Sequence, residues 1–266
     1  HLKLYKRPVY FVSSNTHSLV NVLTRFVKDE EAVLTRFLYE SKNDQLITLW
    51  EQIERGEYAG NRENFLYYLA KKYAVVEPSI FVRKQQKEKA LGIYTIKPSH
   101  YLDIAIQIIE VSKLARAHID ERLRMDLAPL AKSNAVIVNV DYPLGWAAYQ
   151  VLIEIGQNVE SIRGVYIMGK AATLNGNIGD ILLPNTVLDQ HTKNVYAIHN
   201  AFTATDFAHV FKTGAVLDDQ KTVAVKGTFF ENNQLIGEWY RKGYTIIEME
   251  TWPYLNAAYE FVYYNR

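Results

Sequence analysis

The sequence has no cysteine, which excludes disulfide bonds, thiolate catalysis and cysteine-ligated zinc. It has no apolar window of about 18 residues, so no membrane span is expected. Its formal net charge is only +1, so the sequence lacks the excess of positive charge that is typical of nucleic-acid-binding proteins. A signal-peptide pattern is also missing, although the chain begins at His1 rather than at Met. We therefore expect a cytoplasmic protein that binds neither membranes nor nucleic acid.

Two common catalytic constellations are missing as well. The seven histidines form no HExxH pair, and His191 and His199 have no carboxylates at ligand spacing, so we expect no metal site. The chain also has no G-x-S-x-G turn of the kind that carries a nucleophilic serine. The chemistry must therefore be sought in other residue types.

The first half of the chain is expected to be mainly helical. The apolar run PVYFV at residues 8–12 predicts a strand, and the polar cluster after it predicts a loop, so residues 1–16 are assigned to an α/β core. Residues 17–132 are then predicted as a helical region with a helical pattern over 19–37. Pro98 and Ser99 are typical of a helix start, which predicts a long helix through Arg124.

The second half, residues 133–266, has the pattern of an α/β core. Apolar runs alternate with helix-like text there, which is typical of strands covered on both faces. The runs are AVIVNV (135–140), GVYIMG (164–169), ILLP (181–184), TVAVKG (222–227) and YTIIEME (244–250). We predict the α/β class, with a mixed, mostly parallel sheet flanked by helices and an added helical region.

Ligands of an open α/β sheet bind outside the carboxyl ends of its strands, so the residues after each run are candidates for a site. One of these stretches is the glycine-rich piece GKAATLNGNIGD (169–180). It would serve as a phosphate-binding loop only if it opened into a helix, whereas it leads into a strand-like run. A tight turn between two strands is the favoured alternative.

Glu248 and Glu250 flank Met249 where a strand-like run becomes helix-like. Strand alternation places both carboxylates on one side, and Thr251 followed by Pro253 predicts the start of a helix. Acidic residues at that position stabilise a helix N-terminus by up to about 1 kcal/mol. The residues alone leave open whether this pair is structural or functional.

The order of these stretches resembles the nucleoside phosphorylase and nucleosidase superfamily. The matching text is VDYPLG, GKAATL, GDILLP, GTFF and IEMET, in the order and approximate spacing of that family. The resemblance covers roughly residues 133–262, and its most specific element is the Glu-Met-Glu triplet. It implies a nucleoside-phosphorylase-like fold and cleavage of an N-glycosidic bond by phosphorolysis or hydrolysis, with release of a free base.

The resemblance also implies roles for individual residues. Glu250 would be the catalytic carboxylate that binds the ribose hydroxyls, with Met249 packed against the sugar. Phe230, or else Phe229, would stack on the base. The remaining expected substrate contacts are Gly169, Lys170, Ala171, Ala172 and Glu248. Glu248 is alternatively a support or a cap for the next helix, and Asp180 is expected to shape a turn.

Three departures from the family pattern bear on the reaction. Lys170 replaces a small hydroxyl residue, and it would either bind a phosphate or fill the pocket. The loop after the first strand has Ser13 and Ser14 in place of a glutamate, which suits phosphate as a co-substrate; Gly145 is a third candidate. His17 in this loop is expected to be a capping or surface residue.

The third departure is that the text stops after VYYNR, before the family's late aspartate. We expect either an incomplete carboxyl end or the loss of the leaving-group acid. The leading hypothesis is an enzyme acting on a nucleoside or nucleotide, without a cofactor other than phosphate as a co-substrate, and assembled as a homo-oligomer. The alternative is a catalytically degenerate relative that binds a nucleoside or only assembles with partners.

Overall fold

The computed structural model describes residues 2–58, 62–99, 103–120, 125–207, 211, 214–227 and 233–264. The chain divides into two compact units. The α/β unit comprises His1–Asn15, Lys97–Ile106 and Ala135–Arg266, and the helical unit comprises Thr16–Ile96 and Gln107–Asn134. None of the helices in the described ranges has both the length and the apolar character that a membrane crossing requires.

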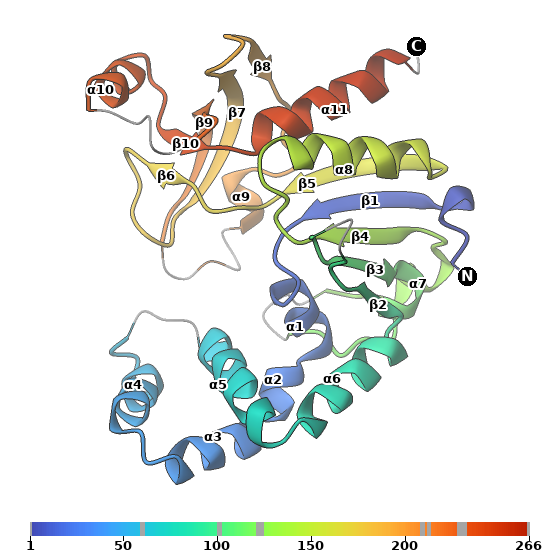
Figure 1. Ribbon diagram of the computed structural model, residues 1–266, viewed down its shortest axis with the longest axis vertical. Coiled ribbons are helices and arrows are strands. Elements are labelled where there is room, and N and C mark those ends of the chain that lie inside the picture. The colour runs from blue at the N-terminus through green and yellow to red at the C-terminus, as the bar shows by residue number, and fades with distance from the viewer. Residues whose placement is uncertain are drawn as a thin grey trace. The chain divides into compact units, whose positions relative to one another are not determined.

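The α/β unit combines strands and helices (Figure 1). Its strands are β1 (Pro8–Ser13), β4 (Val136–Val140), β5 (Ser161–Ile167), β6 (Ala172–Thr173), β7 (Ile181–Asp189), β8 (Val195–Ala197), β9 (Val216–Ala224) and β10 (Ile246–Glu248). Its helices are the 3-10 helix η1 (Leu4–Lys6) and the α-helices α8 (Trp146–Gln157), α9 (Ala204–Phe207), α10 (Asn233–Arg241) and α11 (Thr251–Tyr264). A helix follows each of β4, β8, β9 and β10. The predicted α/β class is confirmed.

The strands of this unit lie in two sheets. In the first, β1 is parallel to both β4 and β5 and lies between them. The second sheet has the order β6-β10-β9-β7-β8, in which β10 and β7 are parallel to β9 while β6 and β8 are antiparallel to their neighbours. The predicted apolar runs all form strands, but they are divided between two sheets rather than joined in one.

Two helices of the α/β unit pack against each other, as Figure 1 shows for α8 and α11. A Cβ atom at Gly156 of α8 would lie 2.0 Å from the ring of Phe261 on α11, so glycine permits this close approach. The Tyr149 hydroxyl of α8 donates to the Glu260 carboxylate of α11 at 2.7 Å. One apolar cluster, formed by Val187, Tyr196, Ala224, Trp252 and Leu255, joins α11 to the second sheet.

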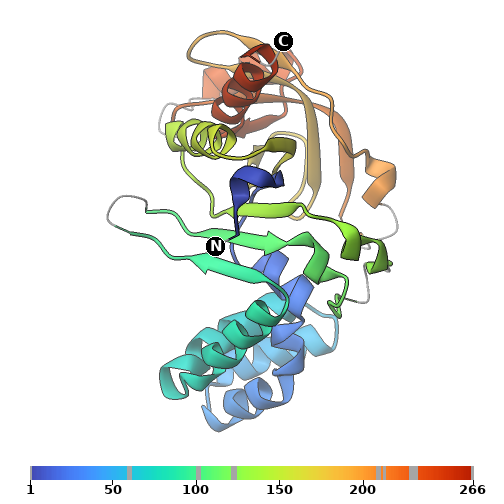
Figure 2. The ribbon, with the colours of Figure 1, turned by 90° about the vertical axis from the view of Figure 1, so that its right-hand side faces the viewer.

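The helical unit begins with α1 (Ser18–Thr24) and continues through a series of further elements. These are α2 (Phe26–Asp29), α3 (Glu31–Glu40), α4 (Asp44–Glu54), α5 (Arg62–Val76), α6 (Ser79–Ala90), β2 (Ile93–Ile96), β3 (Ile106–Glu110), α7 (Val111–Leu114) and the 3-10 helix η3 (Ala128–Lys132). Helix α5 contacts both α3 and α6, and these helices lie together in Figure 2. The helical pattern over 19–37 is interrupted at Arg25, which has φ of 52° and separates α1 from α2.

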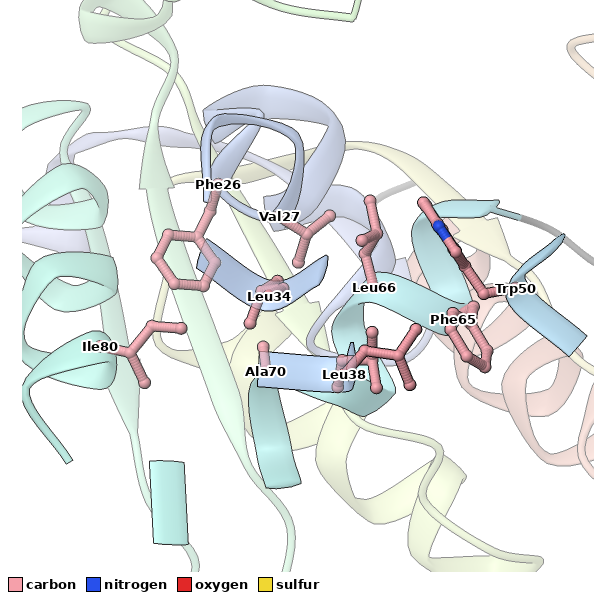
Figure 3. Close-up of a cluster of buried hydrophobic side chains, with 10 residues drawn as sticks. Phe26, Val27, Leu34, Leu38, Trp50, Phe65, Leu66, Ala70 and Ile80 are labelled. Atoms are coloured by element: carbon pink, nitrogen blue, oxygen red, sulfur yellow. The ribbon is translucent and has the colours of Figure 1, made fainter. Parts of the chain in front are cut away.

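The helical unit has its own apolar core, drawn in Figure 3. Leu34 and Leu38 of α3 are fully buried there, four residues apart on one helix face. Trp50 of α4 stacks on Phe65 of α5 with ring centroids 5.6 Å apart. The core of this unit is therefore formed by side chains from α2 to α6.

The predicted long helix from Pro98 to Arg124 is wrong in its described part. Residues Ile106–Glu110 instead form β3, which is hydrogen-bonded to β2, and only Val111–Leu114 are α-helical. The run IQII is rich in β-branched residues, and the tertiary pairing with β2 overrides the local helix-start signal of Pro98 and Ser99. His17, expected to cap or to lie at the surface, precedes α1 and stacks on Tyr67 with centroids 4.7 Å apart.

Candidate active site at the carboxyl ends of the strands

Three strand ends meet at one edge of the first sheet. Ser13 at the end of β1 is paired with Val140 of β4 and with Ile167 of β5, and all three strands run in the same direction. The loops that follow β4 and β5 therefore start at the same edge as Ser13. One of them leads to Gly145, the residue that precedes α8.

The loop after β5 connects this edge to the second sheet. Its Met168 N–H donates to the Ser13 carbonyl at 2.9 Å, and its far end, Ala172, is paired with Ile247 of β10. The Glu248 carbonyl in turn accepts a hydrogen bond of 2.8 Å from the Val225 N–H, just after β9. The fold thus brings the end of β1, the 168–172 loop and the Glu-Met-Glu triplet to one site.

Glu248 binds the start of helix α11. Its Oε2 atom accepts hydrogen bonds from the Glu250 N–H at 2.6 Å and from the Thr251 N–H at 2.7 Å, which are orphan donors of a helix N-terminus. Its Oε1 atom is buried and has no hydrogen-bond partner among the described residues. Burial raises the pKa of Glu248 to about 7, the two main-chain bonds oppose that rise, and the charge of Glu250 adds to it.

Glu250 has a carboxylate oxygen that lacks a hydrogen-bond partner among the described residues. Its Oε1 atom is shielded from solvent, and no hydrogen-bond donor among the described residues reaches it. Burial raises the pKa of Glu250, while hydrogen bonding from the main chain of Gly145 and Met249 lowers it in part. A ligand with hydroxyl donors would satisfy this oxygen.

The sequence analysis assigned no role to Tyr254 and Asn139, which bind Ser13 at the end of β1 and Ser14 just after it. The Tyr254 hydroxyl donates to Ser13 Oγ at 2.9 Å, and Ser14 Oγ donates to Asn139 Oδ1 at 2.8 Å. Ser13 and Ser14 are both buried. Each hydroxyl predicted to bind phosphate therefore already has a protein partner inside the unit.

One signal for this network was available in the sequence. Asn139 is the single polar residue of the run AVIVNV, and a buried amide in a strand requires partners. Tyr254 gave no comparable signal, because an aromatic residue in the first turns of a helix most often fills a core.

The other predicted substrate contacts have different environments. Gly169, Lys170, Ala171 and Ala172 are exposed along the 168–172 loop. Met249 is partly buried and packs against the cluster of Val223, Val225, Trp239 and Ile247. Phe229 and Phe230 lie outside the described residues.

The glycine-rich stretch forms a turn between strands, as the favoured alternative predicted. It leads from β6 into β7, and Thr173 Oγ1 accepts a hydrogen bond of 3.0 Å from the Gly176 N–H. Asp180 accepts from the N–H groups of Asn177 and Ala215, each at 2.7 Å, and these bonds lower its pKa. Asp180 therefore shapes the turn.

In the part of the chain that the structure describes, no group of three or more His, Asp or Glu side chains could hold a metal ion. Two hollows of about 330 and 380 Å³ are lined only by residues of the helical unit, around His118 and Arg62 respectively. Glu248 and Glu250 are two neighbouring carboxyl groups of the α/β unit whose pKa values are both raised, which is typical of functional sites.

Comparison with known proteins gives one family match over the whole chain. The model of the family of unknown function DUF6909 matches residues 1–266. A search of curated protein sequences finds no match.

Similar solved structures include nucleosidases and a phosphorylase. The 5'-methylthioadenosine/S-adenosylhomocysteine nucleosidase of Neisseria meningitidis is 12% identical over 67% of this chain and 75% of its own, with a TM-score of 0.45. The nucleosidase of the same name from Colwellia psychrerythraea is 12% identical over 66% and 72%, with a TM-score of 0.46. Uridine phosphorylase of Schistosoma mansoni is 12% identical over 61% and 60%, with a TM-score of 0.38.

Proposed function

The chain belongs to the family of unknown function DUF6909, and we propose that it cleaves the N-glycosidic bond of a nucleoside or nucleotide at the carboxylate site. The observation that carries this proposal is the buried Glu250 Oε1 atom, to which none of the described residues donates a hydrogen bond. Vicinal sugar hydroxyls are donors of the kind that this oxygen lacks. The order of the strand-end motifs, which resembles that of the nucleosidase superfamily, supports the same reading.

The chemistry requires a negative charge beside the sugar. When the bond between C1' and the base nitrogen breaks, its electron pair leaves with the base and the ribose gains oxocarbenium character. The Glu250 carboxylate would hold the sugar hydroxyls and stabilise that positive charge. An oxygen of water or of hydrogen phosphate then forms the new bond to C1', and the proton that it loses ends on the departing base. Glu250 must be ionised for this role, so its raised pKa predicts loss of activity at acidic pH.

Two further segments of the chain would contact the base and the phosphate of the ligand. Phe230, or else Phe229, would stack on the base, with an affinity of about 1–3 kcal/mol by analogy with other base-stacking sites. The exposed backbone from Gly169 to Ala172 would border sugar and base, and Lys170 would bind the phosphate of a nucleotide or of the co-substrate.

The test is release of free base from a panel of purine and pyrimidine nucleosides and nucleotides, with and without inorganic phosphate. Glu250→Gln keeps the shape of the side chain but removes its charge, and we expect a loss of about 10²–10³-fold in kcat. Glu260→Gln is the matched control, because Glu260 lies on the same helix and binds Tyr149. It should retain activity.

Each outcome has a distinct meaning. Release that needs phosphate identifies a phosphorylase, and release without it identifies a hydrolase. If no compound of the panel yields base, or if Glu250→Gln is as active as Glu260→Gln, the proposal is wrong.

A further inference from the structure

A buried pair of hydroxyl groups joins two parts of the site that are far apart in sequence. Tyr254 is 1% exposed and Ser13 is 3% exposed, and the Tyr254 hydroxyl donates to Ser13 Oγ at 2.9 Å. The two residues are separated by 241 positions. This bond therefore depends on how β1 and α11 pack together, and not on the local conformation of either segment.

One partner of the pair is held rigidly. Ser13 is the last residue of β1, and its backbone is paired with Val140 on one side and with Ile167 on the other. Its carbonyl also accepts the Met168 N–H. Ser13 is thus a fixed point at the strand edge.

The other partner belongs to the same helical turn as the proposed catalytic carboxylate. The Tyr254 N–H donates to the Glu250 carbonyl at 3.4 Å, the spacing of one α-helical turn. Burial, together with the charge of Glu250, raises the pKa of Tyr254, so the phenol stays protonated as a donor at neutral pH. The hydroxyl bond consequently fixes this turn against β1.

We propose that Tyr254 is a positioning residue: its bond to Ser13 holds the first turn of α11, and with it the Glu250 carboxylate, at the end of β1. The catalytic consequence rests on the proposed function, whereas the positioning itself does not. Proper placement matters because small displacements of a group that acts in the transition state reduce rates strongly.

The substitution Tyr254→Phe isolates the hydroxyl. The ring packs edge-on against Phe11 with centroids 5.5 Å apart, a contact that phenylalanine retains. Tyr196→Phe is a matched control, because the Tyr196 hydroxyl also donates to α11, at Asn256 Oδ1, and Tyr196 is likewise buried. Both variants lose one tyrosine hydroxyl that binds the same helix; the Tyr254 bond is buried and the Tyr196 bond is partly buried.

The first measurement is hydrogen–deuterium exchange of peptides covering 246–256, which needs no substrate. We expect amides in Tyr254→Phe to exchange about tenfold faster than in the wild type, because losing one buried hydrogen bond changes a local opening equilibrium by about that factor. Tyr196→Phe should leave the amides of Glu250 and Thr251 unchanged. Equal exchange in the two variants, or no change in either, overturns the positioning role.

The second measurement is kcat and KM for base release in Tyr254→Phe, Ser13→Ala and the double variant. If Tyr254 acts through Ser13, the double variant should be no slower than the slower single variant, and kcat should fall more than KM rises. Additive losses overturn the coupling. If exchange changes as expected but the wild type releases no base, the proposed function fails while the positioning role stands.

Discussion

At the residue scale, the two glutamates of the Glu-Met-Glu triplet differ in what their oxygens contact. Glu248 uses Oε2 to accept two main-chain N–H groups at the start of α11. Glu250 keeps Oε1 without a partner among the described residues, as a free acceptor. The Glu248 carboxylate thus stabilises the start of α11, which is the segment that carries the Glu250 carboxylate.

The raised pKa of Glu248 predicts a stability that depends on pH. Because its pKa is about 7 in the folded protein and 4.5 when unperturbed, the folded state retains a proton that the unfolded state releases between these values. Stability should therefore fall as pH rises from about 4.5 to about 7, by up to roughly 3 kcal/mol from this group.

Glu248→Gln should remove that fall, since glutamine does not titrate and its amide oxygen still accepts the two N–H groups. The measurement is the free energy of unfolding in urea at pH 5 and pH 8 for both proteins. Glu248→Ala separates capping from titration, because it loses the hydrogen bonds as well. If wild type and Glu248→Gln change equally between the two pH values, the assigned pKa is wrong.

At the scale of elements, helix α8 is connected to the site at both of its contacts. It begins directly after Gly145, and it packs against α11. Ala148, Val151 and Leu152 are buried on one face of α8, at the spacing of an amphipathic helix. The main chain of Gly145, just before this helix, interacts with the Glu250 carboxylate and lowers its pKa. Packing of α8 and the geometry of the site are therefore linked.

Leu152→Ala should test that packing. Leu152 is fully buried, and the truncation is expected to lower the free energy of unfolding by about 2–5 kcal/mol through lost burial and a residual cavity. The measurement is urea unfolding followed by tryptophan fluorescence. Val262→Ala on α11 is the control, since Val262 is 53% exposed and its truncation should cost less than about 0.5 kcal/mol. Similar losses in both variants would contradict the burial of Leu152.

At the scale of the whole molecule, the chain has two compact units with separate apolar cores. The helical unit is centred on Leu34, Leu38 and neighbouring side chains of α2 to α6 (Figure 3). The α/β unit contains every predicted site residue that the structure describes. We expect a substitution in one core to leave the other core unchanged.

Leu34→Ala should destabilise the helical unit by about 2–5 kcal/mol, because Leu34 is fully buried in its core. Hydrogen–deuterium exchange of native protein should rise in α3 and α5, while peptides covering 246–256 keep their wild-type exchange. Val75→Ala, at a site that is 82% exposed in α5, should change neither. Faster exchange at 246–256 in Leu34→Ala would show that the cores are not independent.

Much of the fold could be predicted because most of its strands are indicated by the residues within the strand itself. Continuous apolar runs with β-branched residues indicated β1, β4, β5, β7, β9 and β10, and Thr251 with Pro253 indicated the start of α11. The strand β3 was missed, since its pairing with β2 overrode the helix-start signal before it.

The sequence by itself determined the α/β class, the order of the strand-end motifs and the place of the carboxylate pair at a strand-to-helix junction. These features depend on periodicity and on neighbouring residues, which a sequence displays directly. Only the tertiary structure decided that Ser13 and Ser14 are buried, that the strands form two sheets and that Tyr254 binds Ser13. A hydrogen bond across 241 positions depends on strand register and helix packing, and no local pattern encodes these.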